Sequence, residues 1–286
     1  MAKKAKTVSF YGQEAGKYFE QYLPSYGKYP ANAIRLAMIT KRLRETGAKT
    51  VLDCGCGSCM PLVLLLQEGF EAEGFDFSGE MVEEGKKILQ KAGYPKELAW
   101  KADLLSWKPK KNYDAALALG VFPHIKEKDE KTALLNIGNS LKSNGTAFIE
   151  FRNSLFAAFT LNRHSLLFYL NDLIMQEKLP KELSQEISDF YSKRLDVAQP
   201  QRQEGKINYS DITAKFNNPL VIGKELFEPC GFTLKKIHFY HFHALPPAFE
   251  EKHPGLFKEL SLAMENPGDW RGYLMASAFV AEAEKK

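Results

Sequence analysis

A glycine-rich loop after a short β-branched run is the feature that most constrains the fold of this chain. The loop, Asp53-Cys54-Gly55-Cys56-Gly57-Ser58-Cys59, follows Thr50-Val51-Leu52 and comes about twenty residues before Asp76, which ends a second apolar run. Glycines at 55 and 57 let the backbone take positive φ and approach a ligand closely. A carboxylate at the tip of the next strand can accept hydrogen bonds from both hydroxyls of a ribose. The layout is that of a site for a nucleotide-like cofactor.

A dinucleotide-binding fold is one candidate for this layout. Its fingerprint is G-x-G-x-x-G, in which the third glycine lets the helix pack close to the strand. Met60 occupies that third place, and its bulky thioether argues against a pyrophosphate pressed on the helix end. Asp53, which opens the loop, is also foreign to the fingerprint. An NAD-linked oxidoreductase is therefore the weaker alternative.

The loop resembles the first motif of the class I S-adenosylmethionine (SAM)-dependent methyltransferases, which reads D-x-G-x-G-x-G. Cys59 stands where that motif has its last glycine. Further segments match the family in order and at suitable spacing: Gly74-Phe75-Asp76-Phe77-Ser78-Gly79-Glu80-Met81, Lys101-Ala102-Asp103-Leu104, Tyr113 to Leu119, and Leu141-Lys142-Ser143-Asn144-Gly145 as a helix-end turn before a strand from Thr146 to Phe151. The resemblance covers residues 50–151 well and the rest more loosely. It implies a small-molecule methyltransferase with SAM as its cofactor.

The resemblance also implies how SAM is held. Asp76 binds the ribose, and the residues after it flank the adenine. Asp103 accepts a hydrogen bond from the adenine amino group, a donor that needs an acceptor when it is buried. The expected cofactor-binding residues are Asp53, Cys54, Gly55, Gly57, Cys59, Asp76, Phe77, Met81, Asp103, Leu104 and Leu119 in the core, with Tyr11 and Tyr18 from an N-terminal lid.

The expected fold class is α/β: a seven-stranded, mostly parallel Rossmann-like sheet with helices on both faces, a last strand inserted antiparallel, and a helical cap insertion. The chain's 286 residues suffice for one large domain with an insertion or for two small domains. The expected divisions are an N-terminal helical lid at 1–46, a cofactor-binding core at 47–151, a helical cap at 152–218, and the C-terminal part of the core at 219–286. In that last part we expect a helix from Gly223 to Cys230 ended by Gly231, a strand from Phe232 to Phe242, a helix from Pro254 to Glu265, and a final strand from Tyr273 to Ala283.

Two helical regions flank the expected core. Aromatic residues between Tyr11 and Tyr22 recur at helical spacing, and a second helix is predicted over Ala33 to Arg44. In the insertion, Leu183, Ile187, Phe190, Tyr191 and Leu195 fall on one helical face, and Pro180 separates two helices. The resemblance implies that the first region lies over the cofactor and the second caps the acceptor pocket. The alternative for the first region is that its aromatic residues only fill the core. The alternative for the second region is a structural or dimer-forming helical hairpin.

His124 is the candidate catalytic base. It follows the fourth strand, at the carboxyl edge where ligands of open α/β sheets bind. An imidazole near its ordinary pKa can accept a hydroxyl proton at neutral pH. A loop histidine that caps the next helix is the alternative.

The candidate substrate contacts are Arg152 and Asn153 at the end of the fifth strand, Asn162 and Arg163 in the insertion, and His241 and His243 near the end of the sixth strand. The two histidines are two residues apart and therefore share a face of an extended strand. The arginines suggest a polar or anionic acceptor, although surface salt bridges explain them equally well.

Composition and cysteine placement narrow the class of partner. Thirty-nine basic and 35 acidic residues leave a net charge of +4. The basic and acidic residues are spread along the chain, so no basic surface for nucleic acid is expected. No apolar run approaches the roughly 18 residues that span a bilayer, and no signal-peptide pattern is present, so we expect a cytoplasmic protein without a membrane partner.

Cys54, Cys56 and Cys59 crowd one turn while Cys230 lies far away, which favours small buried thiols over a metal or arsenic site. No metal is therefore expected.

The acceptor is the least determined part. We expect transfer to an oxygen or nitrogen of a small polar molecule such as a sugar, a carboxylate or a natural-product intermediate, by a monomer or homodimer. A nucleic-acid methyltransferase would show Asn/Asp-Pro-Pro-Tyr/Phe after the fourth strand or a basic accessory domain, whereas residues 119–123 read LGVFP. A protein methyltransferase remains an alternative. A non-catalytic cofactor-binding protein would be expected to lack Asp76 or Asp103, and both are present.

Overall fold

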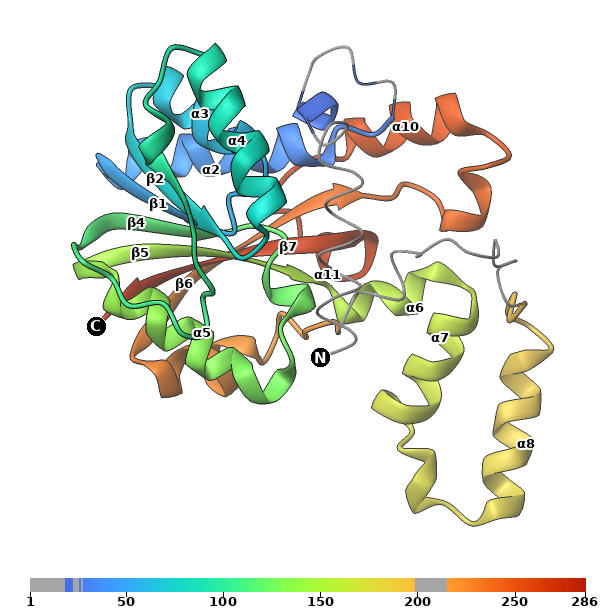
Figure 1. Ribbon diagram of the computed structural model, residues 1–286. Helices are drawn as coiled ribbons and strands as arrows, with labels where there is room; N and C mark the ends of the chain where they lie inside the picture. Colours follow the sequence, from blue (N-terminus) through green and yellow to red (C-terminus); the bar gives the residue numbers. More distant parts are fainter. Residues whose placement is uncertain (1–18, 23–25, 27, 199–214) are drawn as a thin grey trace.

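The computed structural model describes residues 19–22, 26, 28–198 and 215–286. These residues form a seven-stranded sheet in the order β3-β2-β1-β4-β5-β7-β6 (Figure 1). The strands are β1 Thr50–Cys54, β2 Glu71–Asp76, β3 Ala99–Lys101, β4 Tyr113–Ala118, β5 Leu141–Arg152, β6 Phe232–Phe242 and β7 Ala276–Lys285. Neighbouring strands pair in parallel except at β7, which is antiparallel to both β5 and β6. The expected sheet, with its last strand inserted antiparallel, is confirmed.

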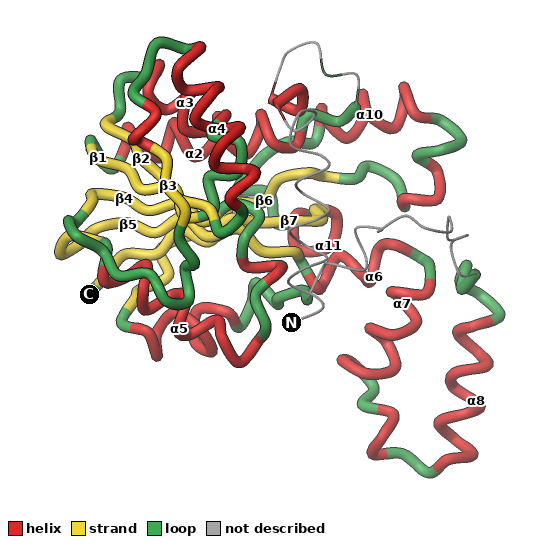
Figure 2. The backbone as a smooth tube through the Cα atoms, viewed as in Figure 1, coloured by secondary structure: helices red, strands yellow, loops and turns green. Residues whose placement is uncertain are grey.

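Helices cover both faces of the sheet (Figures 1 and 2). The α-helices are α2 Ala31–Glu45, α3 Met60–Gln67, α4 Gly79–Lys91, α5 Glu127–Asn139, α6 Ala157–Thr160, α7 Arg163–Leu167, α8 Lys181–Ser192, α10 Pro254–Ala263 and α11 Gly272–Met275. Short 3₁₀ turns span Phe19–Tyr22, Lys96–Leu98, Phe122–His124, Ser154–Phe156, Gln176–Lys178, Glu228–Cys230 and Pro247–Phe249, and π-helical turns span Phe168–Leu173 and Gly223–Phe227.

The core has two layers because the central strands are buried on both faces. In β4, Ala115 and Leu117 pack toward α2 and α3, while Ala116 and Ala118 pack toward α5. Leu36, Ile39 and Leu43 of α2 complete the first layer, and Ala133, Leu134 and Ile137 of α5 belong to the second. Because β1, β2, β4 and β5 pair in parallel, their carboxyl ends lie along one edge of the sheet.

Three boundaries differ from expectation. The segment from Leu141 to Gly145 belongs to β5 rather than to a helix-end turn, because buried Leu141 pairs with Tyr113 before the register shifts. The helix expected from Gly223 to Cys230 is a π-helical turn followed by a 3₁₀ turn, since Pro229 cannot donate a helical hydrogen bond. The last strand begins at Ala276, not at Tyr273, because the preceding residues form α11.

The insertion forms a helical hairpin that extends from the body of the molecule (Figures 1 and 2). Its two arms contact through Tyr169 and Tyr191, whose ring centroids are 5.1 Å apart. Helix α8 begins directly after Pro180, as predicted, and buries none of its residues. Leu183 and Phe190 are 43% and 51% exposed. Whether the hairpin caps an acceptor stays a prediction.

In the part of the chain that the structure describes, no helix combines the length and the apolar character needed to cross a membrane.

Candidate active site

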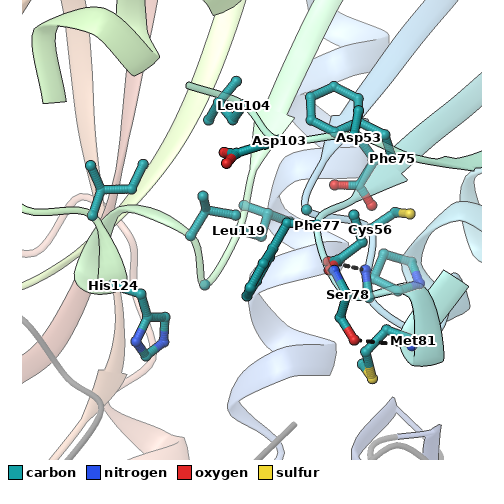
Figure 3. Close-up of a pocket in the computed structure, with 18 of the residues that line it drawn as sticks. Asp53, Cys56, Phe75, Phe77, Ser78, Met81, Asp103, Leu104, Leu119 and His124 are labelled. Atoms are coloured by element: carbon teal, nitrogen blue, oxygen red, sulfur yellow. Dashed lines mark hydrogen bonds between the residues drawn. The ribbon is translucent and has the colours of Figure 1, made fainter. Parts of the chain in front are cut away.

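A cavity of about 390 Å³ lies at the carboxyl ends of the central strands (Figure 3). Its walls come from the turns after β1, β2, β3 and β4 and from α2. Among the predicted site residues, those that line it are Asp53, Gly55, Gly57, Asp76, Phe77, Met81, Asp103, Leu104, Leu119 and His124. Most of the predicted cofactor residues are therefore brought together at one place.

The glycine-rich loop forms the floor because two of its residues carry no side chain. Gly55 has φ 93°, and a Cβ there would lie 2.3 Å from Cγ2 of Val121. Gly57 has φ 53°. The Gly55 and Cys56 amides both donate to the Phe75 carbonyl, at 2.7 and 3.0 Å, which fastens the loop to the end of β2. A side chain at position 55 would close the cavity and strain the backbone.

Asp76 stands at the tip of β2 with its carboxylate held in a fixed orientation. Its oxygens accept the Gly57 amide at 3.0 Å and the Ser78 amide at 2.8 Å. Burial raises the pKa of Asp76, and the backbone donors counteract part of that rise. Ser78 caps α4 by accepting the Met81 amide at 3.3 Å (Figure 3). The loop after β1 and the helix after β2 are thus joined through one carboxylate.

Asp53 is the most unusual group in the cavity. It is 1% exposed, and among the described residues its Oδ1 has no hydrogen-bond partner. Burial raises its pKa to about 7, although the charge of Arg35 acts in the opposite direction. Arg35, from α2, lines the same cavity and forms a buried ion pair with Glu150 of β5. A buried carboxylate oxygen without a donor fits a cationic or hydrogen-bond-donating ligand.

The opposite end of the cavity suits a flat, partly polar ring. Leu104 is buried, and Asp103, which precedes it, accepts the Leu105 amide at 3.2 Å. Phe77 faces this pair across the cavity in Figure 3. A carboxylate between apolar walls can recognise an amino-substituted ring.

Two predicted cofactor residues do not line the cavity. Cys54 is fully buried in the layer shared with α5 because side chains alternate along β1. Cys59 has φ 62°, and its sulfur points to α4, where a Cβ on Gly85 would lie 2.4 Å from Sγ. Cys56 lines the cavity instead, and its Sγ is 3.7 Å from that of Cys59.

Other lining residues had not been predicted from the sequence: Tyr22, Arg35, Cys56, Pro61, Ser78, Val121, Lys126 and Asp129 are among them. Arg35 had one available signal. It lies four residues before Ile39, on the apolar stripe of α2, where a charge requires a buried partner. The others lie on loops or at the first turns of helices such as α3 and α5, and only tertiary packing decides which of them face the cavity. Tyr11 and Tyr18 lie outside the described residues.

His124 enters the cavity from the β4 side (Figure 3). It ends the 3₁₀ turn Phe122–His124, and its backbone amide donates to the Val121 carbonyl at 3.0 Å. Phe122 is fully buried and fixes the turn. The imidazole is thus held where a reacting group beside the loop would meet it.

The predicted substrate residues lie outside this cavity. The Asn153 amide donates to the carbonyls of Gly272, Tyr273 and Ala276, and so joins β5 to the start of β7. Asn162 caps α7 by accepting the His164 amide at 2.8 Å, and Arg163 is the first residue of that helix.

His241 and His243 lie together at the end of β6, with ring centroids 4.8 Å apart. His241 has φ 59°, so regular strand alternation, on which their shared face was predicted, is broken there. Burial is the main cause that lowers the pKa of His241. His243 and then Arg152, at the end of β5, lower it further.

Comparison with known proteins identifies the core. Residues 51–145 match a family model described as a methyltransferase domain. This part of the core, residues 51–145, is a methyltransferase domain. Human glycine N-methyltransferase is 26% identical over 127 residues, which is 39% of this chain and 43% of the human protein. The rabbit enzyme of the same name matches to the same extent. The match thus spans less than half the length of these curated relatives.

Solved structures extend the likeness in fold to almost the whole chain. Magnesium protoporphyrin IX methyltransferase from Synechocystis PCC 6803 with bound S-adenosylhomocysteine (SAH) superposes with a TM-score of 0.54 at 13% identity, covering 96% of this chain and 94% of that one. Its SAM-bound form gives a TM-score of 0.51 at 14% identity, covering 98% and 97%. The class I methyltransferase fold expected from the sequence is confirmed.

Proposed function

We propose that this methyltransferase-domain protein transfers a methyl group from SAM to an oxygen or nitrogen of a small polar molecule. The order of the groups along the sheet edge carries the proposal. Asp103 and Leu104 follow β3, Asp76 ends β2, Asp53 lies near the end of β1 with the glycines after it, and His124 follows β4. In a SAM molecule adenine is followed by ribose and then by the sulfonium, which carries both the methyl group and the amino-acid tail, so the tail can lie at β1 while the methyl group points toward β4. One extended ligand therefore meets a suitable group at each strand end.

Each side chain has a distinct task in this proposal. Asp103 accepts a hydrogen bond from the adenine amino group, Asp76 holds the ribose hydroxyls, and the free oxygen of Asp53 faces the ammonium of the amino-acid tail. When bound, SAM supplies a methyl group already activated by the sulfonium charge. The protein then has to orient the acceptor in line with that methyl group, and such positioning can lower a barrier by roughly 7–11 kcal/mol. His124 receives the proton of a hydroxyl acceptor.

The choice of a small acceptor is supported by the shape and charge of the site. The cavity is enclosed on several sides by loop residues, and the net charge of +4 is small for a 286-residue chain. The names of the human and Synechocystis proteins both denote small acceptors, glycine and a porphyrin. A nucleic-acid or protein acceptor is the alternative. The exclusion of a membrane partner, the cytoplasmic location and a monomeric or homodimeric state remain predictions.

Calorimetric titration with SAH tests the donor site. SAH should bind, and Asp76→Ala should weaken binding by about 10- to 100-fold, because charge-assisted hydrogen bonds to the ribose are lost. Asp172→Ala, at an exposed position of the insertion, is the matched control and should leave the affinity unchanged. Binding of NAD with no response to SAH or SAM would overturn the proposal.

The acceptor class is tested with SAM carrying a tritiated methyl group. Purified protein is incubated with cell extract that has been divided into small-molecule, protein and nucleic-acid fractions. Label should appear in the small-molecule fraction. Label confined to the nuclease-sensitive or protease-sensitive fraction would move the assignment to the corresponding alternative.

The role of His124 is tested by His124→Ala. Removal of a general base should lower the turnover of an oxygen acceptor by about 10²–10⁴-fold, while SAH affinity stays within twofold. His253→Ala, at an exposed position before α10, is the control. An unchanged turnover in His124→Ala would exclude His124 from the mechanism.

A further inference from the structure

Buried polar atoms without a partner gather at a second place on the same sheet edge. Among the described residues, both ring nitrogens of His243 and Oε2 of Glu265 have no hydrogen-bond partner. His243 is only 7% exposed. Native proteins contain few such atoms, and each calls for an explanation. At the donor loop, Oδ1 of Asp53 is in the same condition, and there the ligand proposed above supplies the missing donor.

These atoms belong to one connected group, which we call the imidazole cluster: Tyr29, His241, His243, Glu265 and Ser277. The Tyr29 hydroxyl donates to Oε1 of Glu265, and the Tyr29 ring lies 4.9 Å from that of His241. His241 is 4.8 Å from His243, and its Nδ1 is 2.9 Å from the Ser277 hydroxyl. Oε1 of Glu265 also accepts the Phe242 amide at 2.9 Å. The cluster is therefore held in place by β6, by β7 and by the segments before α2 and after α10.

The surroundings of His243 are aromatic and partly open. Phe156 and Phe257 flank its ring at centroid distances of 4.7 and 5.5 Å. Phe156, Tyr29 and His241 are only half-buried, so the cluster is bordered by accessible surface. Aromatic faces beside unsatisfied polar atoms are the usual composition of a site for a small organic ligand.

The cluster lies next to the donor groups along the sheet edge. The donor groups run along the edge from β3 through β2 and β1 to β4, so the ends of β5, β7 and β6 come next. Arg35 lines the donor cavity and pairs with Glu150 on β5. Arg152, about 7 Å further along β5, acts electrostatically on both Glu150 and His241. The two sites are thus neighbours along the sheet.

The unsatisfied atoms select the chemistry of a ligand. A neutral imidazole offers one N–H donor and one acceptor nitrogen, and Oε2 of Glu265 offers an acceptor. An anion cannot complement this set because it would face the Glu265 carboxylate. An ammonium only donates, so it leaves the imidazole N–H unsatisfied. Neighbouring hydroxyls both donate and accept, and the C–H faces of a sugar ring suit the aromatic walls.

We propose that the imidazole cluster binds the methyl acceptor through a polyhydroxylated, sugar-like part. One hydroxyl donates a hydrogen bond to Oε2 of Glu265, and adjacent hydroxyls form hydrogen bonds with the two ring nitrogens of His243. Burial lowers the pKa of His243 to about 4, which keeps the ring neutral at pH 7. That the bound molecule is the methyl acceptor rests on the proposed function. That the cluster binds hydroxyl groups rests on the contacts of the cluster alone.

Saturation-transfer NMR tests the inference on the full chain, with and without SAH. The probes are L-rhamnose, D-glucose and myo-inositol, with glycine and acetate as the competing chemistries. Saturation should reach ring protons of at least one polyol and should fall about tenfold in His243→Phe. His253→Phe, exposed before α10, is the matched control and should keep the signal. Urea unfolding should show His243→Phe at least as stable as the wild type, because an apolar ring removes two unsatisfied nitrogens.

Absence of polyol saturation, saturation of glycine or acetate alone, or a polyol signal that survives in His243→Phe would each overturn the inference. If His243→Phe fails to fold, Glu265→Gln decides: loss of the polyol signal supports the cluster, and an unchanged signal overturns it. SAH titration separates the two proposals. Polyol binding without SAH binding refutes the proposed function alone, and SAH binding without polyol binding refutes the inference alone.

Discussion

At the scale of single residues, the cavity depends on carboxylates placed in different environments. Asp76 is satisfied by two backbone donors, whereas Asp53 keeps one buried oxygen without a partner. Burial raises the pKa of Asp53 to about 7. Because that value lies near physiological pH, the charge of Asp53 itself changes with pH in this range.

Donor binding should therefore depend on pH. Only ionised Asp53 attracts the ammonium group of SAH, so affinity should fall by up to about tenfold per pH unit as the pH drops below 7. At pH 7, binding should release protons, because the ligand favours the ionised form. Calorimetry between pH 6 and 8.5, in buffers of different ionisation enthalpy, measures both effects. Asp53→Asn should bind more weakly with no such dependence, and a pH-independent wild type would contradict the role of Asp53.

At the scale of elements, the loop is shaped by the packing of α3 against α4. Cys59 lies directly before α3 at φ 62°, a conformation that favours glycine. Its sulfur fills the space that Gly85 of α4 leaves, since a Cβ on Gly85 would lie 2.4 Å from Sγ. A cysteine and a glycine thus complement each other across the helix pair. The last position of the loop motif serves helix packing here.

Gly85→Ala should consequently destabilise the protein although alanine favours helices. Overpacking against Cys59 should cost about 1–3 kcal/mol and weaken SAH binding through the displaced loop. Cys59→Gly in the same chain should restore most of the lost stability, because it removes the clashing sulfur and suits the positive φ. Urea unfolding of the single and double variants measures the coupling.

Gly255→Ala is the control for that pair. Gly255 lies in α10, where an added Cβ meets nothing within 4 Å, so the change should be neutral or stabilising by up to about 1 kcal/mol. Equal effects of Gly85→Ala and Gly255→Ala would show that the contact with Cys59 has no energetic weight.

At the scale of the whole molecule, α2 is attached to the sheet by buried charges. Arg35 pairs with Glu150 of β5, which also accepts the Tyr240 hydroxyl at 2.7 Å. About two helical turns after Arg35, Arg42 donates to both carboxylate oxygens of Glu282 at 2.8 Å. Glu282 also contacts Nε2 of His238 at 2.6 Å. These contacts join the helix to β5, β6 and β7, and so hold one wall of the cavity against the sheet.

Acid should loosen this attachment. Hydrogen bonds from His238 and Arg42 outweigh the effect of burial and lower the pKa of Glu282 to about 2, against an ordinary 4.5. Because the folded-state pKa is depressed, the stabilisation is present above pH 4.5 and is lost as the pH falls toward 2. The full loss is about 3 kcal/mol. Urea midpoints from pH 2 to 7 measure it, and Glu282→Gln should be less stable at pH 7 but should lose less on acidification. Parallel curves would contradict the assignment.

The sheet, the glycine loop, and the positions of Asp76 and Asp103 at strand ends could be predicted from the sequence. Strand periodicity, φ preference and spacing along the chain are local properties, and they fix which residues end each strand. Only contacts in the folded chain bring Arg35 to the cavity, turn Cys59 toward α4, and join Tyr29 to Glu265 and His241. Those contacts join segments distant in sequence, and their geometry follows from how helices and strand ends pack, which no local pattern encodes.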